Sequence, residues 1–238
     1  EANTTSGLGA LGCSNMIIGG TAAGQRNIFY NSDSQIRFGN CSNVTIKGNY
    51  IGLNIDGVTD EAGATGILSE GTNTNVIIGG SLAGERNYII AGDNSTGIVM
   101  SSGTTSIIQG NYIGTNAAGT AAMGIGNGIS CGSNCTIGGT DAGEGNLIGG
   151  ASDRGISISG STGGTVIQGN YVGINAAGDA AIPNNNGIYV EDSIDVTIGG
   201  TDASARNFIA GNTGNGVTLQ GVWGPVTGNL IQMNYIGT

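Results

Sequence analysis

The sequence predicts an all-β fold, a parallel solenoid in which each turn of the coil is one repeat. The first observation is composition: 49 of 238 residues are Gly, 2 are Pro and only 9% are charged. Each glycine inside a helix costs about 1 kcal/mol relative to Ala, which disfavours helices. Collagen is excluded because no Gly-X-Y period runs through the chain. The other two observations are a sequence repeat and a column of asparagines within it.

The repeat has a long period of about 60 residues that contains two similar halves. One motif, Ile17-Ile18-Gly19-Gly20-Thr21, returns at 77–81, 136–140 and 197–201. A second motif, Gly48-Asn49-Tyr50-Ile51-Gly52, returns at 110–114, 169–173 and 233–237. The halves define about eight units of about 30 residues, each with three short apolar segments. We therefore expect residues 1–238 to form one β-helix domain of four double-turn repeats.

Each segment is a predicted strand that pairs with its counterpart in the next turn, so that like side chains stack in columns. The first segment centres on Leu8, Ile36, Ile67, Ile98, Ile129, Ile156, Ile188 and Val217. The second centres on Ile18, Ile46, Ile78, Ile108, Ile137, Ile167, Ile198 and Ile231. The third begins at an asparagine and carries, two residues later, Phe29, Ile51, Ile89, Ile113, Ile148, Val172, Ile209 and Ile236. These columns are the predicted core.

The asparagines that open the third segments are predicted to form a ladder, because an amide at a tight turn can bond to the amides above and below it. They are Asn27, Asn49, Asn87, Asn111, Asn146, Asn170, Asn207 and Asn234. With segments such as Gly187-Ile188-Tyr189-Val190 and Val196-Thr197-Ile198-Gly199, the chain resembles the right-handed parallel β-helix proteins of the pectate-lyase-like superfamily. The resemblance covers nearly the whole chain and implies a right-handed coil. It implies little about function, since that fold serves lyases, hydrolases, adhesins and phage spikes.

Charge excludes several functions. The net charge is −10, and six Lys plus Arg are too few to neutralise a run of phosphates, so no nucleic-acid partner is expected. No apolar run approaches the length of a bilayer span, so no membrane insertion is expected. Histidine, the usual general base, is absent. The catalytic residues of the resembled family are not matched at any position, so no enzymatic activity is expected.

Cysteine spacing predicts two disulfides. Cys13 and Cys41 each lie five residues before the centre of a second segment, which places them in one column of adjacent turns. Cys131 and Cys135 flank a three-residue turn. The alternative is four buried thiols. Two disulfides would indicate an oxidising compartment, so we expect an extracellular or cell-surface protein.

An outward column on the third segment is rich in aromatic residues. It contains Tyr50, Tyr88, Tyr112, Tyr171, Phe208 and Tyr235, interrupted by Leu147. This strip could bind sugar rings or another rod, or it could be covered by the loops as a satellite core. Arg26, Arg86 and Arg206 precede ladder asparagines and are predicted to clamp loop carbonyls.

Two further groups are weaker candidates. Glu191, Asp192 and Asp195, with Asp202 nearby, could hold Ca²⁺, although a solvated acidic turn is the commoner meaning and no cofactor is expected. Five sequons, at Asn3, Asn40, Asn43, Asn94 and Asn134, are candidate glycosylation sites.

Neither end of the sequence contains a predicted capping helix or charged cap. We therefore expect uncapped ends, belonging to a segment of a longer array or to copies that stack head to tail. The expected function is structural: an extracellular filament, stalk or adhesin whose main partner is itself. The alternatives are a polysaccharide-binding or polysaccharide-cleaving protein and, on a face rich in β-branched residues, an ice-binding protein.

Overall fold

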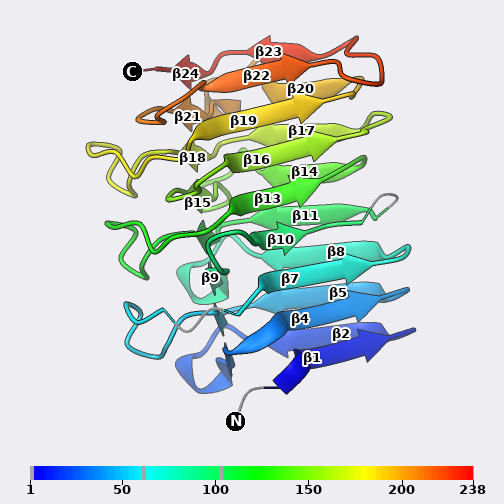
Figure 1. Cartoon of the computed structure of the whole chain (residues 1–238), viewed down its shortest axis with the longest axis vertical. Coiled ribbons are helices and arrows are strands. Elements are labelled where there is room, and N and C mark those ends of the chain that lie inside the picture. The colour runs from blue at the N-terminus through cyan, green and yellow to red at the C-terminus, as the bar shows by residue number, and fades with distance from the viewer. Residues whose placement is uncertain (1–2, 61–62, 102–103, 238) are drawn as a thin grey trace.

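The computed structural model describes residues 3–60, 63–101 and 104–237 as a right-handed parallel β-solenoid of eight turns. Each turn contributes one strand to each of three eight-stranded sheets, and all strand pairs within the sheets are parallel (Figure 1). The predicted fold class is therefore confirmed. With strands about 4.8 Å apart, eight turns make a stack about 38 Å long.

Strand bounds follow the predicted segments closely. The first sheet contains β1 (Asn3–Leu11), β4 (Ser32–Gly39), β7 (Thr65–Glu70), β10 (Thr96–Val99), β13 (Asn127–Cys131), β16 (Arg154–Ser159), β19 (Asn186–Glu191) and β22 (Val217–Gln220). The second contains β2 (Ser14–Gly19), β5 (Ser42–Lys47), β8 (Thr74–Gly79), β11 (Ser106–Gln109), β14 (Cys135–Gly138), β17 (Thr165–Gln168), β20 (Val196–Gly199) and β23 (Leu230–Gln232). The third contains β3 (Ile28–Phe29), β6 (Tyr50–Ile51), β9 (Tyr88–Ile89), β12 (Tyr112–Ile113), β15 (Leu147–Ile148), β18 (Tyr171–Val172), β21 (Phe208–Ile209) and β24 (Tyr235–Ile236).

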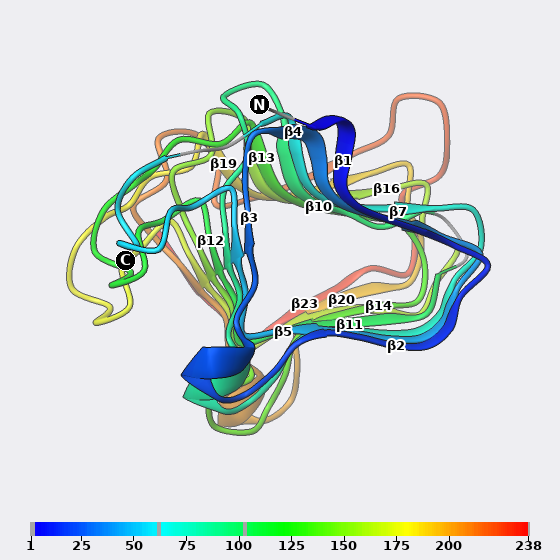
Figure 2. The same cartoon turned by 90° about the horizontal axis from the view of Figure 1, so that it is seen from below.

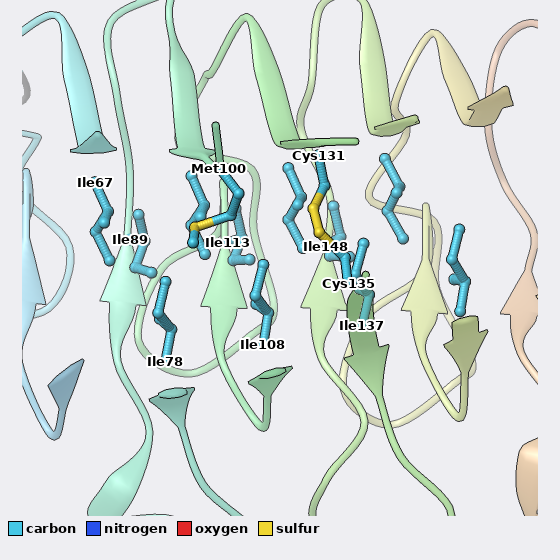
Figure 3. Close-up of a cluster of buried hydrophobic side chains, with 14 of the residues drawn as sticks. Ile67, Ile78, Ile89, Met100, Ile108, Ile113, Cys131, Cys135, Ile137 and Ile148 are labelled. Atoms are coloured by element: carbon cyan, nitrogen blue, oxygen red, sulfur yellow. A yellow bond between two sulfur atoms is a disulfide. The ribbon is translucent and has the colours of Figure 1, made fainter. Parts of the chain in front are cut away.

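The register places like residues beside one another. Ile98 pairs with both Ile67 and Ile129 in the first sheet, and Ile108 pairs with Ile78 and Ile137 in the second. The inward isoleucines of the inner turns are fully buried and form one continuous core along the axis (Figure 3). Each turn thus covers the apolar edge of its neighbour, which is the source of stability in a solenoid.

The corner after the second sheet requires glycine. Gly79 has φ +90°, and a Cβ placed there would lie 1.9 Å from the Gln109 carbonyl oxygen of the next turn. Only a residue without a side chain fits both the conformation and the space. Glycine therefore sets how tightly successive turns can stack at this corner.

Two kinds of loop lie outside the coil (Figure 2). In three odd-numbered turns, the loop before the third sheet contains a short 3-10 helix: η1 (Ala23–Gln25), η2 (Ala83–Glu85) and η3 (Ala203–Ala205). In three even-numbered turns, the loop after the third sheet is a hairpin closed by an antiparallel bridge, such as that between Thr115 and Ala122. Both kinds border the outer face of the third sheet, where the aromatic column lies.

Candidate functional site on the third sheet

The asparagine ladder runs along the start of the third sheet. Each side-chain Nδ2 donates to the Oδ1 of the next rung, over distances of 2.8–3.1 Å. Each backbone N–H donates to that same oxygen, as Asn146 does to Asn170 at 3.1 Å. The six inner rungs are fully buried. The predicted ladder is confirmed, and the hydrogen bonds from one rung to the next all run in one direction along the axis.

Two shorter ladders were missed in the sequence. Outside the coil, Asn43 donates to Asn15 at 2.9 Å and Asn75 donates to Asn43 at 2.8 Å. Inside, Asn184 donates to Asn212 at 3.0 Å. The sequence signal was available for the outer ladder, because its asparagines recur three residues before the central isoleucine of the second segment. The inner ladder joins Asn184 and Asn212, which lie in loops where the repeat has no fixed equivalent positions.

The aromatic column divides into two stacks. Tyr88 lies edge-on to Tyr50 and to Tyr112, with ring centroids 5.0 and 5.7 Å apart. Beyond the interruption at Leu147, Tyr171 stacks face to face on Phe208 at 5.0 Å. Tyr50 is buried against Leu53 and Ile90 of its own turn and the next, and Leu147 is also buried. The loops therefore cover part of the column, and the strip is not a flat, continuous platform.

The arginines before the ladder cap the tyrosines. Nε of Arg26 donates to the Gly48 carbonyl at 3.3 Å, and its guanidinium lies 4.3 Å from the centre of the Tyr50 ring. The corresponding distances for Arg86, with Gly110 and Tyr112, are 3.1 and 4.0 Å. For Arg206, with Met233 and Tyr235, they are 2.9 and 4.2 Å. The predicted carbonyl clamp is present, and the cation–π contact is an addition to it.

A groove opens on this face where the arginine series is interrupted. In the fifth turn, Gly145 stands at the position of the arginines. The groove has a volume of about 460 Å³, and its lining includes Leu147, Tyr171 and Phe208. Aromatic rings, a charged loop and an open cavity meet in this groove.

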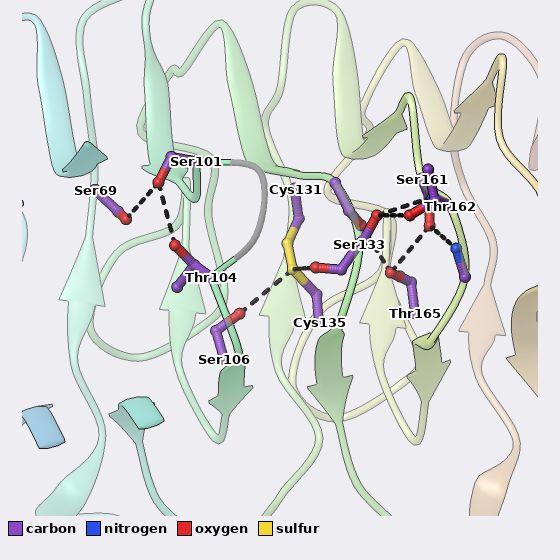
Figure 4. The surroundings of a disulfide bond; sticks show 12 residues. Ser69, Ser101, Thr104, Ser106, Cys131, Ser133, Cys135, Ser161, Thr162 and Thr165 are labelled. Carbon is purple, nitrogen blue, oxygen red and sulfur yellow. Dashed lines mark hydrogen bonds between the residues drawn. A yellow bond between two sulfur atoms is a disulfide. The ribbon is translucent and has the colours of Figure 1, made fainter. Parts of the chain in front are cut away.

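One of the two predicted disulfides is present. Cys131 and Cys135 are joined, and both are buried in the core (Figure 4). The prediction of a Cys13–Cys41 disulfide is wrong in this structure, where both are free thiols. They do lie in adjacent turns, and the Cys13 amide donates to Cys41 Sγ at 3.3 Å. Each thiol, however, is directed at a carbonyl oxygen: Cys41 at Gly39 (3.3 Å) and Cys13 at Leu11 (3.6 Å).

The acidic group near residue 191 does not converge on a cation site. The Asp192 carboxylate accepts hydrogen bonds from the amides of Val222, Trp223 and Gly224 at 2.7–3.0 Å. These bonds, led by that from Val222, hold the pKa of Asp192 below its ordinary value of 3.8. Within residues 3–60, 63–101 and 104–237, no group of three acidic, Cys or His side chains could hold a metal ion. Asp192 instead orders the loop that exposes Trp223.

The sequon asparagines differ in their surroundings. Asn40, Asn43, Asn94 and Asn134 are exposed, while the side chain of Asn3 lies outside the described residues. Asn40, Asn43 and Asn134 adopt left-handed backbone conformations at corners. Asn43 is a rung of the outer ladder, and a glycan there would be attached to the Nδ2 that donates to Asn15.

In the described part of the chain, no helix is long and apolar enough to span a bilayer. Comparison with known proteins adds no relative: no family model, no curated protein and no solved structure matches this chain.

Proposed function

We propose that the chain is a structural rod whose copies stack end to end into an extracellular filament or stalk. The observation that carries the proposal is the direction of the asparagine ladder. Each rung accepts from the preceding turn and donates to the following one, so the first turn presents the Oδ1 acceptor of Asn27 and the eighth presents the backbone N–H of Asn234. In the ladder, these two groups are complementary in the same way as those of any two adjacent turns.

The apolar columns support the same proposal. At the edge of the eighth turn, the inward residues Ile231 and Ile236 are 41% and 45% exposed, whereas the inward isoleucines of inner turns are fully buried. A second copy would place Ile18 next to Ile231, in the same column. Covering these side chains removes apolar surface from water at about 25 cal/mol per Å², and the strand edges gain hydrogen-bond partners.

The remaining parts of the proposal rest on sequence patterns. Membership of the pectate-lyase-like superfamily is supported by the repeat and the ladder, both of which occur in that superfamily. An extracellular or cell-surface location is supported by the Cys131–Cys135 disulfide and by exposed sequons. Binding of polysaccharide along the whole aromatic strip is less favoured, because the loops interrupt it.

The test is the association state of the purified chain, with a matched pair of variants. Sedimentation velocity over a hundredfold range of concentration, followed by electron microscopy, should show growing end-to-end species. Ile231→Lys should abolish them, because a lysine tolerated at an open edge cannot be buried between two turns. Ile55→Lys, at a loop position that is 68% exposed, should leave association unchanged. A wild-type chain that stays monomeric throughout would refute the proposal.

A further inference from the structure

The loop that borders the groove is built differently from its counterparts. The loops of the first, third and seventh turns contain η1, η2 and η3 and end in an arginine. The loop of the fifth turn forms no 3-10 helix, has Gly143 at φ +88°, and ends in Gly145. A Cβ on Gly145 would lie 2.0 Å from the Gly169 carbonyl oxygen, so no side chain fits there without a change in the backbone. The chain therefore cannot place its own arginine at this point.

The consequence is that one third-sheet tyrosine of the even-numbered turns lacks the cation–π contact that the others make. Among the third-sheet tyrosines of the even-numbered turns, Tyr50, Tyr112 and Tyr235 each lie beneath a guanidinium. Tyr171 occupies the same column of the sixth turn, and in the described part of the chain no cation lies over its ring. One side of this ring packs on Phe208, and both residues line the groove.

The same loop supplies negative charge. Asp141 lines the groove and is exposed, and Glu144 bonds to the Asp141 amide through Oε2 at 3.0 Å. Within the described residues, neither carboxylate forms an ion pair. The corresponding Glu85 of the third turn, in contrast, is paired with Lys47 at 3.0 Å.

Arg86 and Arg206 also line the groove, so a cation over Tyr171 would lie between two guanidinium groups. The vacant position over Tyr171 is two strand spacings, about 10 Å, from those occupied by Arg86 and by Arg206, which is about the Debye length at 0.1 M salt. The guanidinium groups of Arg26 and Arg86 already lie over tyrosines that are two turns apart. A cation over Tyr171 would therefore complete a regular series, on a chain with a net charge of −10.

We propose that this groove binds a guanidinium group, presented as an arginine side chain by a partner polypeptide, over the Tyr171 ring and beside Asp141. The ligand would make in trans the contact that Arg26, Arg86 and Arg206 make within the chain. Arginine suits the site because a planar guanidinium stacks on an aromatic ring and bonds to a carboxylate at the same time. The proposal concerns single copies and is independent of end-to-end stacking.

The test uses N-acetyl-arginine amide as the probe, with N-acetyl-citrulline amide as an uncharged control of the same shape. The test is run on the Ile231→Lys variant, which stays monomeric if the wild type stacks. In ¹H–¹⁵N NMR titrations of this variant at about 0.1 M salt, the arginine probe should shift the amides of residues 141–145 and 169–171. The citrulline compound should bind at least tenfold more weakly. Citrulline binding of equal strength, or stronger binding of a neutral sugar at the same amides, would overturn the proposal.

Variants locate the site. Tyr171→Leu should weaken binding about tenfold, and the fold tolerates leucine in this column because Leu147 occupies it one turn away. Tyr50→Leu is the matched control, since that ring lies beneath Arg26 and neither residue lines the groove, and it should bind normally. Arg86→Ala should uncover Tyr112, which lines the same groove, and open a second cation position there, with new shifts at residues 110–112. Unchanged binding in Tyr171→Leu would contradict the assignment.

Discussion

Replacing one inner rung of the ladder, Asn146→Leu, should be strongly destabilising although the two side chains have the same branched arrangement of heavy atoms. The Asn146 side chain makes four hydrogen bonds: Nδ2 donates to the Ile108 carbonyl (2.7 Å) and to Asn170 Oδ1 (2.9 Å), and Oδ1 accepts from the amide (3.0 Å) and Nδ2 (3.1 Å) of Asn111. Leucine removes all four from a fully buried site.

The size of the effect follows from which groups keep a partner. Asn170 Oδ1 still accepts from the Asn146 backbone, and Asn111 Nδ2 still donates to the carbonyls of Ile78 and Gln109. The Asn111 N–H and the Ile108 carbonyl lose the bonds that Asn146 gave them. At about 1–3 kcal/mol for each buried group left unsatisfied, the free energy of unfolding should fall by about 2–6 kcal/mol.

The assay is equilibrium urea unfolding of the wild type and two variants, followed by circular dichroism. The control is Asn27→Leu at the exposed edge, where the side chain makes one ladder bond, to Asn49, and the expected loss is about 1 kcal/mol. A loss below about 1 kcal/mol for Asn146→Leu, or equal losses for the two variants, would refute the reasoning that the buried ladder stabilises the coil.

Two further predictions concern the corners and the Trp223 loop. Gly79→Ala should lower the free energy of unfolding by about 3 kcal/mol or more, because strain at positive φ adds to a clash with the Gln109 carbonyl. The control is Gly12→Ala, at φ +64° with no atom within 4 Å of the added Cβ, which should cost only about 1–2 kcal/mol. Similar losses for the two variants in urea unfolding would contradict the steric explanation. Since the folded pKa of Asp192 is depressed, its stabilisation of the loop is complete above pH 3.8 and is lost as pH falls through the lower folded value. The fluorescence of Trp223, the only tryptophan, should therefore change in that acid range. A transition of the same size in Asp192→Asn would rule out Asp192 as its origin.

The fold could be predicted from the sequence because a solenoid repeats one local pattern. Ile98 and Ile129 stand at equivalent positions of their repeats, so pairing like with like places them side by side. The asparagine ladder could be predicted for the same reason, because its asparagines stand at equivalent positions of successive repeats.

The site could be predicted only in part, because its features depend on how far side chains reach. The register correctly placed Cys13 and Cys41 in adjacent turns, but it does not fix the rotamers that direct each thiol to a carbonyl. Similarly, the sequence shows that an arginine recurs at the position of Arg86 in other repeats, but not that the Arg86 guanidinium reaches Tyr112, 26 residues later. The groove lies where Gly145 replaces the arginine of the other loops. The sequence shows this replacement, but its consequence depends on the contacts between the other arginines and the tyrosine rings, which only the structure shows.

Cryo-electron microscopy of the concentrated wild-type chain tests the central claim most directly. If the complementary edges of the first and eighth turns join copies as proposed, the micrographs should contain unbranched filaments with strands perpendicular to the axis, a 4.8 Å spacing and an axial subunit repeat of about 38 Å, or eight strand spacings. Isolated particles that never join, under conditions where the chain is folded, would contradict it.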